Sequence, residues 1–289
     1  MFGQFVINGF ITGLLYALLA IGFALVYNTT HIFHIAAAGI YVFAAYIFWF
    51  FTVRCGIPVW ASAGLSVLLT MVLSWLTELG MYRPLRNRNT SPNVAMIASI
   101  GLMVVLVNVI ALIFGNETKV VDNTIRPTYT LGRLIISTQQ LYQLTVSAGV
   151  ICLFLFLLSR TRIGLRLRAL SLDASLYDTM GYDRLRAFSL AFLGSGFFIG
   201  LASCLTVYDT GLDPNMGMNM LINAMVALIV GGTGRFGTCV VGGLLLGLLQ
   251  STAVYFFASN WQPAITFLLL LCFLFLRPQG IAGYKQRVV

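Results

Sequence analysis

Apolar runs of about twenty residues recur along this chain, and they constrain its fold more than any other feature. They fall at about 5–27, 31–53, 57–81, 93–115, 139–159, 187–208, 220–232, 237–258 and 262–276. A helix needs about 20 apolar residues to cross a bilayer, and backbone in lipid must satisfy its own hydrogen bonds. The runs therefore predict an all-α, polytopic integral membrane protein with about 8–9 transmembrane or re-entrant helical segments. The runs 220–232 and 262–276 are short for full crossings.

The composition agrees with a chain that has little aqueous surface. Of its 289 residues, 59% are hydrophobic and 9% are charged, whereas soluble domains carry about 25% charged residues. A net charge of +9 could suggest a nucleic-acid partner, but thirteen of the seventeen Lys and Arg fall in segments that we place on one side of the membrane. The positive-inside rule explains this asymmetry, so we expect no nucleic-acid binding.

The cysteines stand singly, and four of the five lie inside apolar runs. We find no Cys-x-x-Cys pair and no Cys/His cluster, so the pattern indicates neither a metal site nor a disulfide framework. The first basic residue is Arg54. We therefore expect residues 5–27 to be a retained span rather than a cleaved signal peptide.

The loops divide by charge. The loop at 82–92 holds three arginines, the loop at 160–186 holds six of the seventeen basic residues, and the tail after 276 holds Arg277, Lys285 and Arg287. We predict that all three are cytoplasmic. The 116–138 connection has mixed charge and is expected outside. Counting segments in both directions then puts the C-terminus inside and the N-terminus outside.

Two polar or glycine-rich breaks, at 28–39 and 231–237, interrupt the apolar pattern in the two halves of the chain. Paired interruptions point to a central pathway built from broken helices. The pathway candidates are His34, Asn219, Asn223, Gly231, Gly232 and Gly234. Two questions stay open: His34 either lines the pathway or caps the break, and Asn219 and Asn223 either hydrogen-bond within the bundle or contact the solute.

The segment from Gly232 to Gly237 matches G-x-G-x-x-G, the pattern of a dinucleotide-binding loop. Such a site needs an acidic residue about 20 positions further on, but the last acidic residue of the chain is Asp213. Thr238 stands where a Walker A loop requires Lys. We therefore expect a close turn between two helices, no cofactor, and no ATP-binding motif in this chain.

Polar side chains inside the runs are few. Glu78 is the carboxylate that lies within a span, near its inner end, and we expect it to form an interfacial ion pair. Proton- or sodium-driven carriers usually bury a carboxylate, so secondary transport is disfavoured. Three G-x-x-x-G pairs, Gly9/Gly13, Gly196/Gly200 and Gly243/Gly247, are expected to pack helices within the chain.

Three stretches together resemble the permeases of branched-chain amino acid ABC importers, in particular the shorter, LivH-like member of the pair. The first is 78–86, similar to the family's E-x-x-x-Y-R-P-x-R. The second is the loop at 160–186, with Gly164, Arg168, Ala169, Asp173 and Gly181 at the family's spacing. The third is 223–243, which resembles the family's A-x-x-G-G-x-G pattern. The 277–281 segment is similar to the family's closing P-x-G-I/L. The chain departs from the family at 34–39 and at Tyr177, where the family usually has Ala.

The resemblance implies a single permease domain over 1–289 in a bacterial cytoplasmic (inner) membrane, with a periplasmic N-terminus and a cytoplasmic C-terminus. It implies a periplasmic solute-binding protein, a second homologous permease and two cytoplasmic ATPase subunits as partners. The ATPases would push on the 160–186 loop, whose expected coupling residues are Gly164, Arg166, Arg168, Ala169, Asp173 and Gly181. Five leucines in this loop (Leu165, Leu167, Leu170, Leu172 and Leu176) predict one apolar docking face.

The expected function is thus translocation of branched-chain or related amino acids, with no catalytic residues in this chain. Urea or other small amides remain alternative solutes, because permeases of this type are shared with amide importers. A stand-alone secondary transporter or channel is an alternative of a different class. A membrane-embedded enzyme is disfavoured because no paired carboxylates, Ser/His/Asp set or metal cluster falls on one face.

Overall fold

The computed structural model describes residues 2–88, 90–121, 128–131, 134–172, 174–232, 234, 236–256, 259–277 and 280–281. Its elements, in chain order, are the helices α1 (Phe2–Thr30), α2 (Ala37–Trp49), α3 (Val59–Thr77), α4 (Arg83–Asn87) and α5 (Pro92–Phe114), the strands β1 (Thr128–Leu131) and β2 (Leu134–Ser137), and the helices α6 (Thr138–Arg160), α7 (Arg162–Leu172), α8 (Ala174–Thr179), α9 (Arg184–Thr210), α10 (Met216–Gly231), α11 (Thr238–Phe256) and α12 (Gln262–Leu276). Short π-helical turns extend α2 (Phe50–Arg54) and α3 (Glu78–Tyr82), and a 3₁₀ turn (Ser259–Trp261) precedes α12.

The predicted all-α, polytopic architecture is confirmed. Within the described residues, seven helices are long and apolar enough to cross a membrane by length and composition, and the shorter α10 and α12 are apolar as well. Each of the nine apolar runs corresponds to one of these helices. The hairpin of β1 and β2 was not predicted, because its strands are only four residues long. Its antiparallel register pairs Thr128 with Ser137.

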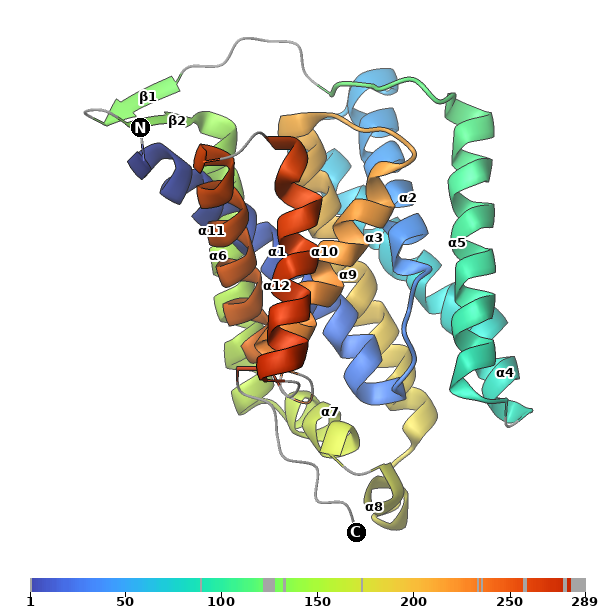
Figure 1. The fold of residues 1–289 in the computed structure, drawn as a ribbon. Coiled ribbons are helices and arrows are strands. Elements are labelled where there is room, and N and C mark those ends of the chain that lie inside the picture. Colours follow the sequence, from blue (N-terminus) through green and yellow to red (C-terminus); the bar gives the residue numbers. More distant parts are fainter. Residues whose placement is uncertain are drawn as a thin grey trace. The chain divides into compact units, whose positions relative to one another are not determined.

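The chain divides into two compact units, and each is described by itself. The first unit comprises Met1–Ile21, Thr124–Phe156 and Ile222–Val289, and the second comprises Gly22–Asn123 and Leu157–Leu221. In the first unit the start of α1 lies against α11 (Figure 1). A Cβ on Gly247 would lie 2.4 Å from the Cα of Gly13, and one on Gly243 would lie 2.7 Å from the Cα of Ala17. The G-x-x-x-G pairs thus pack helices within the chain, as predicted.

Polar side chains also join helices of the first unit. Gln250 on α11 donates from Nε2 to Asn223 Oδ1 on α10 at 3.2 Å and to Thr266 Oγ1 on α12. At one end of the unit, the side chain of Gln4 on α1 makes two hydrogen bonds with the backbone of Ile135 on β2, at 2.6 and 2.9 Å. The first turn of α1 and the hairpin therefore lie together.

In the second unit, α2 packs against α3, α5 and α9 (Figure 1). The core here contains Val42, Ala45, Tyr46 and Phe48 of α2. The most extensive helix contact in this unit is that of α3 with α9, where a Cβ on Gly196 would lie 2.8 Å from the Cα of Met71. The Ser74 hydroxyl donates to the Phe192 carbonyl at 2.7 Å. Small residues on α9 thus let it lie directly on α3.

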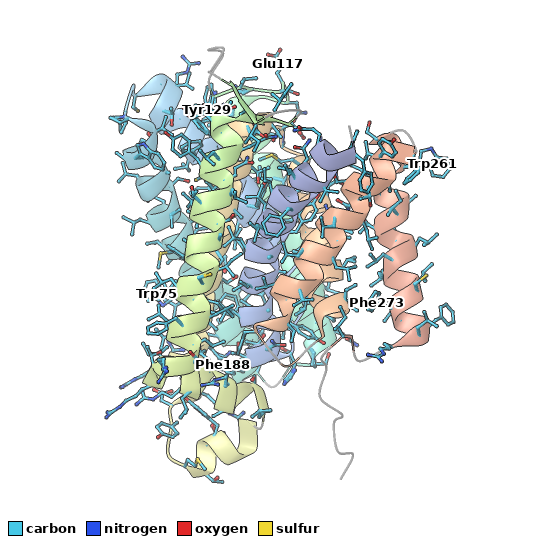
Figure 2. All side chains as sticks on the ribbon, turned by 90° about the vertical axis from the view of Figure 1, so that its left-hand side faces the viewer. Trp75, Glu117, Tyr129, Phe188, Trp261 and Phe273 are labelled. Carbon is cyan, nitrogen blue, oxygen red and sulfur yellow. The ribbon has the colours of Figure 1, made fainter. Side chains whose placement is uncertain are left out.

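The two ends of the second unit are marked by different contacts. At one end, Lys119 and Leu212 pair through backbone hydrogen bonds of 2.9 and 2.8 Å, which join the segment after α5 to the segment after α9. Glu117 lies at this end and Phe188 lies toward the other (Figure 2). The second end carries α4, α7 and α8. This arrangement agrees with the alternation of loops that the sequence predicted.

Candidate functional site

The 160–186 loop forms two short helices, α7 and α8, between α6 and α9. The chain turns at Thr161, whose hydroxyl accepts a hydrogen bond from the Gly164 N–H at 3.2 Å. A Cβ on Gly164 would lie 2.3 Å from the Leu158 carbonyl oxygen. Only glycine therefore lets α7 fold tightly against the end of α6. This close approach gives a physical reason for Gly164 in the predicted set.

The inner face of α7 packs on the first turns of α9. Leu170, Tyr177, Ala187 and Phe188 form a buried cluster, and Ala169 lies against it. Leu167 is also buried. Tyr177, the residue that departs from the family pattern, therefore fills the core between α7, α8 and α9. Burial raises the pKa of its hydroxyl, although the nearby Arg166 opposes this effect.

The prediction of a single leucine face is wrong for the described side chains. Leu167 and Leu170 point inward, whereas Leu165 is 63% exposed and Leu172 is 68% exposed. A helix advances 100° per residue, so positions 165 and 172 share one face and positions 167 and 170 share another. The loop thus has two apolar faces: Leu167 and Leu170 are buried in its core, and Leu165 and Leu172 are exposed.

The outer face of the loop carries charge beside these leucines. Arg166 and Arg168 are exposed. The Arg166 guanidinium lies 5.3 Å from the centre of the Tyr182 ring, and Arg168 Nε donates to the Gly164 carbonyl at 3.4 Å. Gly181 has a φ of +76° in the turn between α8 and α9. Asp173 lies outside the described residues.

A chain of polar contacts leads from this loop to α3. Phe188 is a member of the buried loop cluster, and the centre of its ring lies 4.3 Å from Arg86 Cζ. Arg86 pairs with Glu78 at 2.9 Å, and the other Glu78 oxygen accepts from the Ser189 hydroxyl at 3.1 Å. The predicted ion pair of Glu78 is confirmed, with Arg86 as the partner. The carboxylate is buried, so these contacts tie α3 to the start of α9.

The break at 28–39 lies within the second unit, and His34 is fully buried there. Its Nδ1 lies 2.7 Å from the Tyr82 hydroxyl, and its ring stands edge-on to Phe192. Ser99 on α5 accepts from the Ala36 N–H at 2.7 Å. The break is therefore held by side chains of α3 and α5. His34 Nε2 is buried without a hydrogen-bond partner among the described residues.

The break at 231–237 is built from close backbone contacts within the first unit. A Cβ on Gly242 would lie 2.0 Å from the Ala227 carbonyl oxygen, and one on Gly231 would lie 2.3 Å from the Thr238 carbonyl oxygen. Gly232 and Gly234 have φ values of +104° and +97°. The predicted close turn between two helices is confirmed.

The two asparagines of α10 differ. Asn223 hydrogen-bonds Gln250 within the bundle, as one of the open alternatives proposed, while Asn219 is exposed. Among the residues that the structure describes, no three His, Cys, Asp or Glu side chains lie close enough to hold a metal ion.

Three features were missed by the sequence reasoning. Gly280 and Ile281 lie against the end of α10: Ile281 N–H donates to the Val230 carbonyl at 2.9 Å, and a Cβ on Gly280 would lie 2.5 Å from Gly232 Cα. The Lys119 ammonium lies 4.7 Å from the centre of the Trp49 ring. The Tyr82 side chain contacts both His34 in the α1–α2 break and Phe192 on α9. Gly280 and Tyr82 belong to the family-like motifs at 277–281 and 78–86, and these motifs are the sequence signal that could have pointed to them.

The model of the family described as "branched-chain amino acid transport system / permease component" matches residues 5–274 of this chain. A high-affinity branched-chain amino acid transport system permease protein, BraD of Pseudomonas aeruginosa, is 27% identical, over 98% of this chain and 96% of that protein. LivH of Escherichia coli K12, which has the same description, is 25% identical over 99% of this chain and 96% of that protein. A probable LivH of Methanocaldococcus jannaschii is 27% identical, over 93% and 89%.

The fold is also similar to that of a solved structure. PsaBC from Streptococcus pneumoniae in complex with Fab aligns with a TM-score of 0.52 and 12% identity, over 96% of this chain and 92% of that chain. At this identity the likeness shows the fold alone.

Proposed function

The chain belongs to the branched-chain amino acid transport system permease family, and from this premise we propose that it is the membrane-spanning subunit of an ABC importer for branched-chain or related amino acids. Separate ATPase subunits would supply the energy, a periplasmic binding protein would deliver the solute, and a second homologous permease would complete the membrane part. The chain itself would carry no catalytic residues. It would lie in a bacterial inner membrane with the 160–186 loop in the cytoplasm.

The observation that carries this proposal is the two-sided construction of the 160–186 loop. Its inner face is fixed to α9 through Leu170, Tyr177 and Phe188. Its outer face presents Leu165 and Leu172, beside Arg166 and Arg168. Exposed leucines with basic residues at their rim suit a short helix that seats in the groove of a partner protein. A loop that was merely solvated would not need the outer leucines.

The contacts behind the loop support force transmission. A push on α7 would act on α9 through the buried cluster around Phe188. The Glu78 carboxylate, bonded to both Arg86 and Ser189, would make the inner end of α3 follow α9. The ion pair fixes the segment 78–87, and the Ser189 hydrogen bond to Glu78 and the Arg86 contact with Phe188 join that segment to α9. The inner end of α3 and the start of α9 would therefore move together.

The central experiment is solute uptake by the complete transporter in proteoliposomes with ATP. In R166E/R168E, we expect uptake to fall at least about tenfold while the amount of inserted permease is unchanged, because charge reversal removes the rim of the docking helix. The matched control is R54E/R88E, which alters net charge equally at two exposed positions in other loops. Full uptake in R166E/R168E would overturn the docking role.

A stand-alone secondary transporter or channel is separated from this proposal by the same vesicles. Uptake driven by an ion gradient without the ATPases would support the alternative, and uptake that requires ATP and both ATPases would exclude it. Urea and other small amides are tested as solutes with the cognate binding protein. High-affinity binding of an amide and of no branched-chain amino acid would transfer the proposal to that substrate.

The proposed orientation has its own test. Cys55 is exposed in the segment that follows α2, which we propose to be periplasmic. A membrane-impermeant maleimide should label Cys55 in intact spheroplasts, whereas a cysteine placed at Arg88 should be labelled only after lysis. The reverse labelling pattern would contradict the orientation.

A further inference from the structure

A groove in the second unit borders the C-terminal end of the 160–186 loop. It has a volume of about 500 Å³ and runs between the segment that follows α3 and the first turns of α9. Its lining consists of Arg83, Asp183, Leu185, Arg186, Ser189, Leu190 and Leu193. The groove therefore combines cationic groups at one end with leucine side chains at the other.

The charge of this groove is unbalanced. Asp183 accepts from the Leu185 and Arg186 N–H groups with Oδ1, and its Oδ2 pairs with Arg186 Nε at 3.2 Å. Arg83 has no acidic group within ion-pair distance among the residues that the structure describes. Two guanidinium groups against one carboxylate leave one positive charge. This matches the single negative charge of a phosphodiester.

The leucine end of the groove belongs to a helix that is long and apolar enough to cross a membrane. Leu190 and Leu193 are three residues apart on α9 and so lie on one face. Leu190 is 43% exposed, and no part of the described chain covers it fully. An acyl chain is the neighbour that suits such a side chain in a bilayer.

The position along the helices agrees with the headgroup level. Trp75, one turn before Glu78, is 37% exposed on α3. In Figure 2, Trp75 lies between the levels of Glu117 and Phe188, nearer to Phe188. Tryptophan is enriched where a bilayer meets water. Arg83 follows eight positions later, about two helical turns toward the water, which is the level at which lipid phosphates are found.

We propose that this groove binds an anionic glycerophospholipid, with the headgroup phosphate between Arg83 and Arg186 and one acyl chain along Leu190 and Leu193. Basic pockets between membrane helices are suited to lipid headgroups. The bound lipid bridges the segment after α3 and the start of α9, beside the contact between Glu78 and Ser189. The proposal requires only that the chain spans a bilayer, so it can fail or hold independently of the transported solute.

The test is native mass spectrometry of the full chain in a neutral detergent, titrated with phosphatidylglycerol or with phosphatidylcholine of the same chain length. Each cation near a membrane phosphate contributes enough to change affinity about fivefold. We expect R83Q to weaken phosphatidylglycerol binding about fivefold and R83Q/R186Q up to roughly 25-fold. Phosphatidylcholine binding should be weaker in the wild type and unchanged in the variants.

The control is R88Q, which removes the same charge at an exposed position of the same loop that does not line the groove. It should stay within about twofold of the wild type. R83K keeps the charge and should retain most of the binding. Equal loss in R88Q, or no loss in R83Q/R186Q, overturns the proposal. Displacement of the lipid by millimolar inorganic phosphate would also overturn it, in favour of a soluble anion.

A measurement on the unmodified protein does not depend on the folding of any variant. A phosphatidylglycerol with a photoreactive group in its acyl chain, incorporated into vesicles that contain the assembled complex, should label peptides that include residues 185–193. Labelling only at other helices overturns the proposal. Labelling of the isolated chain that vanishes in the complex would show that a partner protein covers the groove, which also contradicts it.

Discussion

The two helix breaks of this chain fall in different units and are built by different physics. The α10–α11 turn depends on glycines, which let the two backbones touch: a Cβ on Gly242 or Gly231 would lie 2.0 or 2.3 Å from a carbonyl oxygen. The α1–α2 break depends instead on hydrogen bonds from side chains, since Tyr82 bonds His34 and Ser99 bonds the backbone of Ala36. Both satisfy the rule that irregular backbone near a membrane must be enclosed by protein.

The difference teaches which break can tolerate substitution. Backbones in direct contact cannot separate without losing the packing of two whole helices, because membrane interiors offer no water to refill the gap. A side-chain hydrogen bond can be lost while the surrounding helices stay in place. Added volume should therefore harm the glycine turn most, and lost polarity should harm the α1–α2 break.

The largest effect is expected for G242V. The added side chain would collide with the α10 backbone at Ala227, so unfolding should become easier by about 3 kcal/mol or more, with loss of monodisperse protein. Thermal unfolding in detergent, followed by size-exclusion chromatography, measures this. The control is G149V on α6, where no atom lies within 4 Å of the added Cβ. Equal stability of G242V and G149V would refute the backbone-contact interpretation.

The second effect concerns the segment that carries Tyr82. R86A leaves the Glu78 carboxylate buried without its cation. We expect the free energy of unfolding to fall by about 3 kcal/mol. This is at the low end for breaking a buried ion pair, because the guanidinium is partly exposed to water. The control is R88A. In a double-mutant cycle, E78A/R86A should be more stable than R86A alone, and strictly additive losses would exclude a coupled pair.

A smaller effect is expected for Y82F, which removes the hydrogen-bond partner of His34 Nδ1. An unsatisfied buried polar group costs about 2 kcal/mol, while the aromatic contact with Phe192 remains. Thermal unfolding should show this loss, and the exposed Y129F should show none. Unchanged stability of Y82F would mean that the α1–α2 break does not depend on this hydrogen bond.

The smallest effect is expected for G234A. Its φ of +97° disfavours a Cβ, but no atom lies within 4 Å. The cost should be the backbone strain alone, about 1 kcal/mol. Since the protein should still fold, this variant also tests the pathway expectation: uptake should fall while the amount of inserted permease is unchanged. Normal uptake with normal stability would count against a pathway role for Gly234.

The sequence predicted the glycine turn better than the side-chain break. Gly231, Gly232 and Gly234 could be recognised because clustered glycines have few uses between two apolar runs. For His34, two roles stayed open at the sequence level, because its partner Tyr82 lies 48 positions away. No local pattern reports such a contact. The leucines of the 160–186 loop were assigned one face for a similar reason, since their spacing alone did not show that α9 covers only part of the helix.

The sequence by itself determined the membrane class, the number of apolar segments, the division of charge between loops and the family. These follow from the transfer of each residue between water and lipid, a property that is local and nearly additive. The tertiary structure alone decided that Glu78 pairs with Arg86, that Tyr82 holds His34, that Gly280 covers Gly232, and that Arg83 and Arg186 face one groove. Those contacts join residues far apart in the sequence. Hydropathy allows many arrangements of the same helices, and the close packing of their side chains selects one of them.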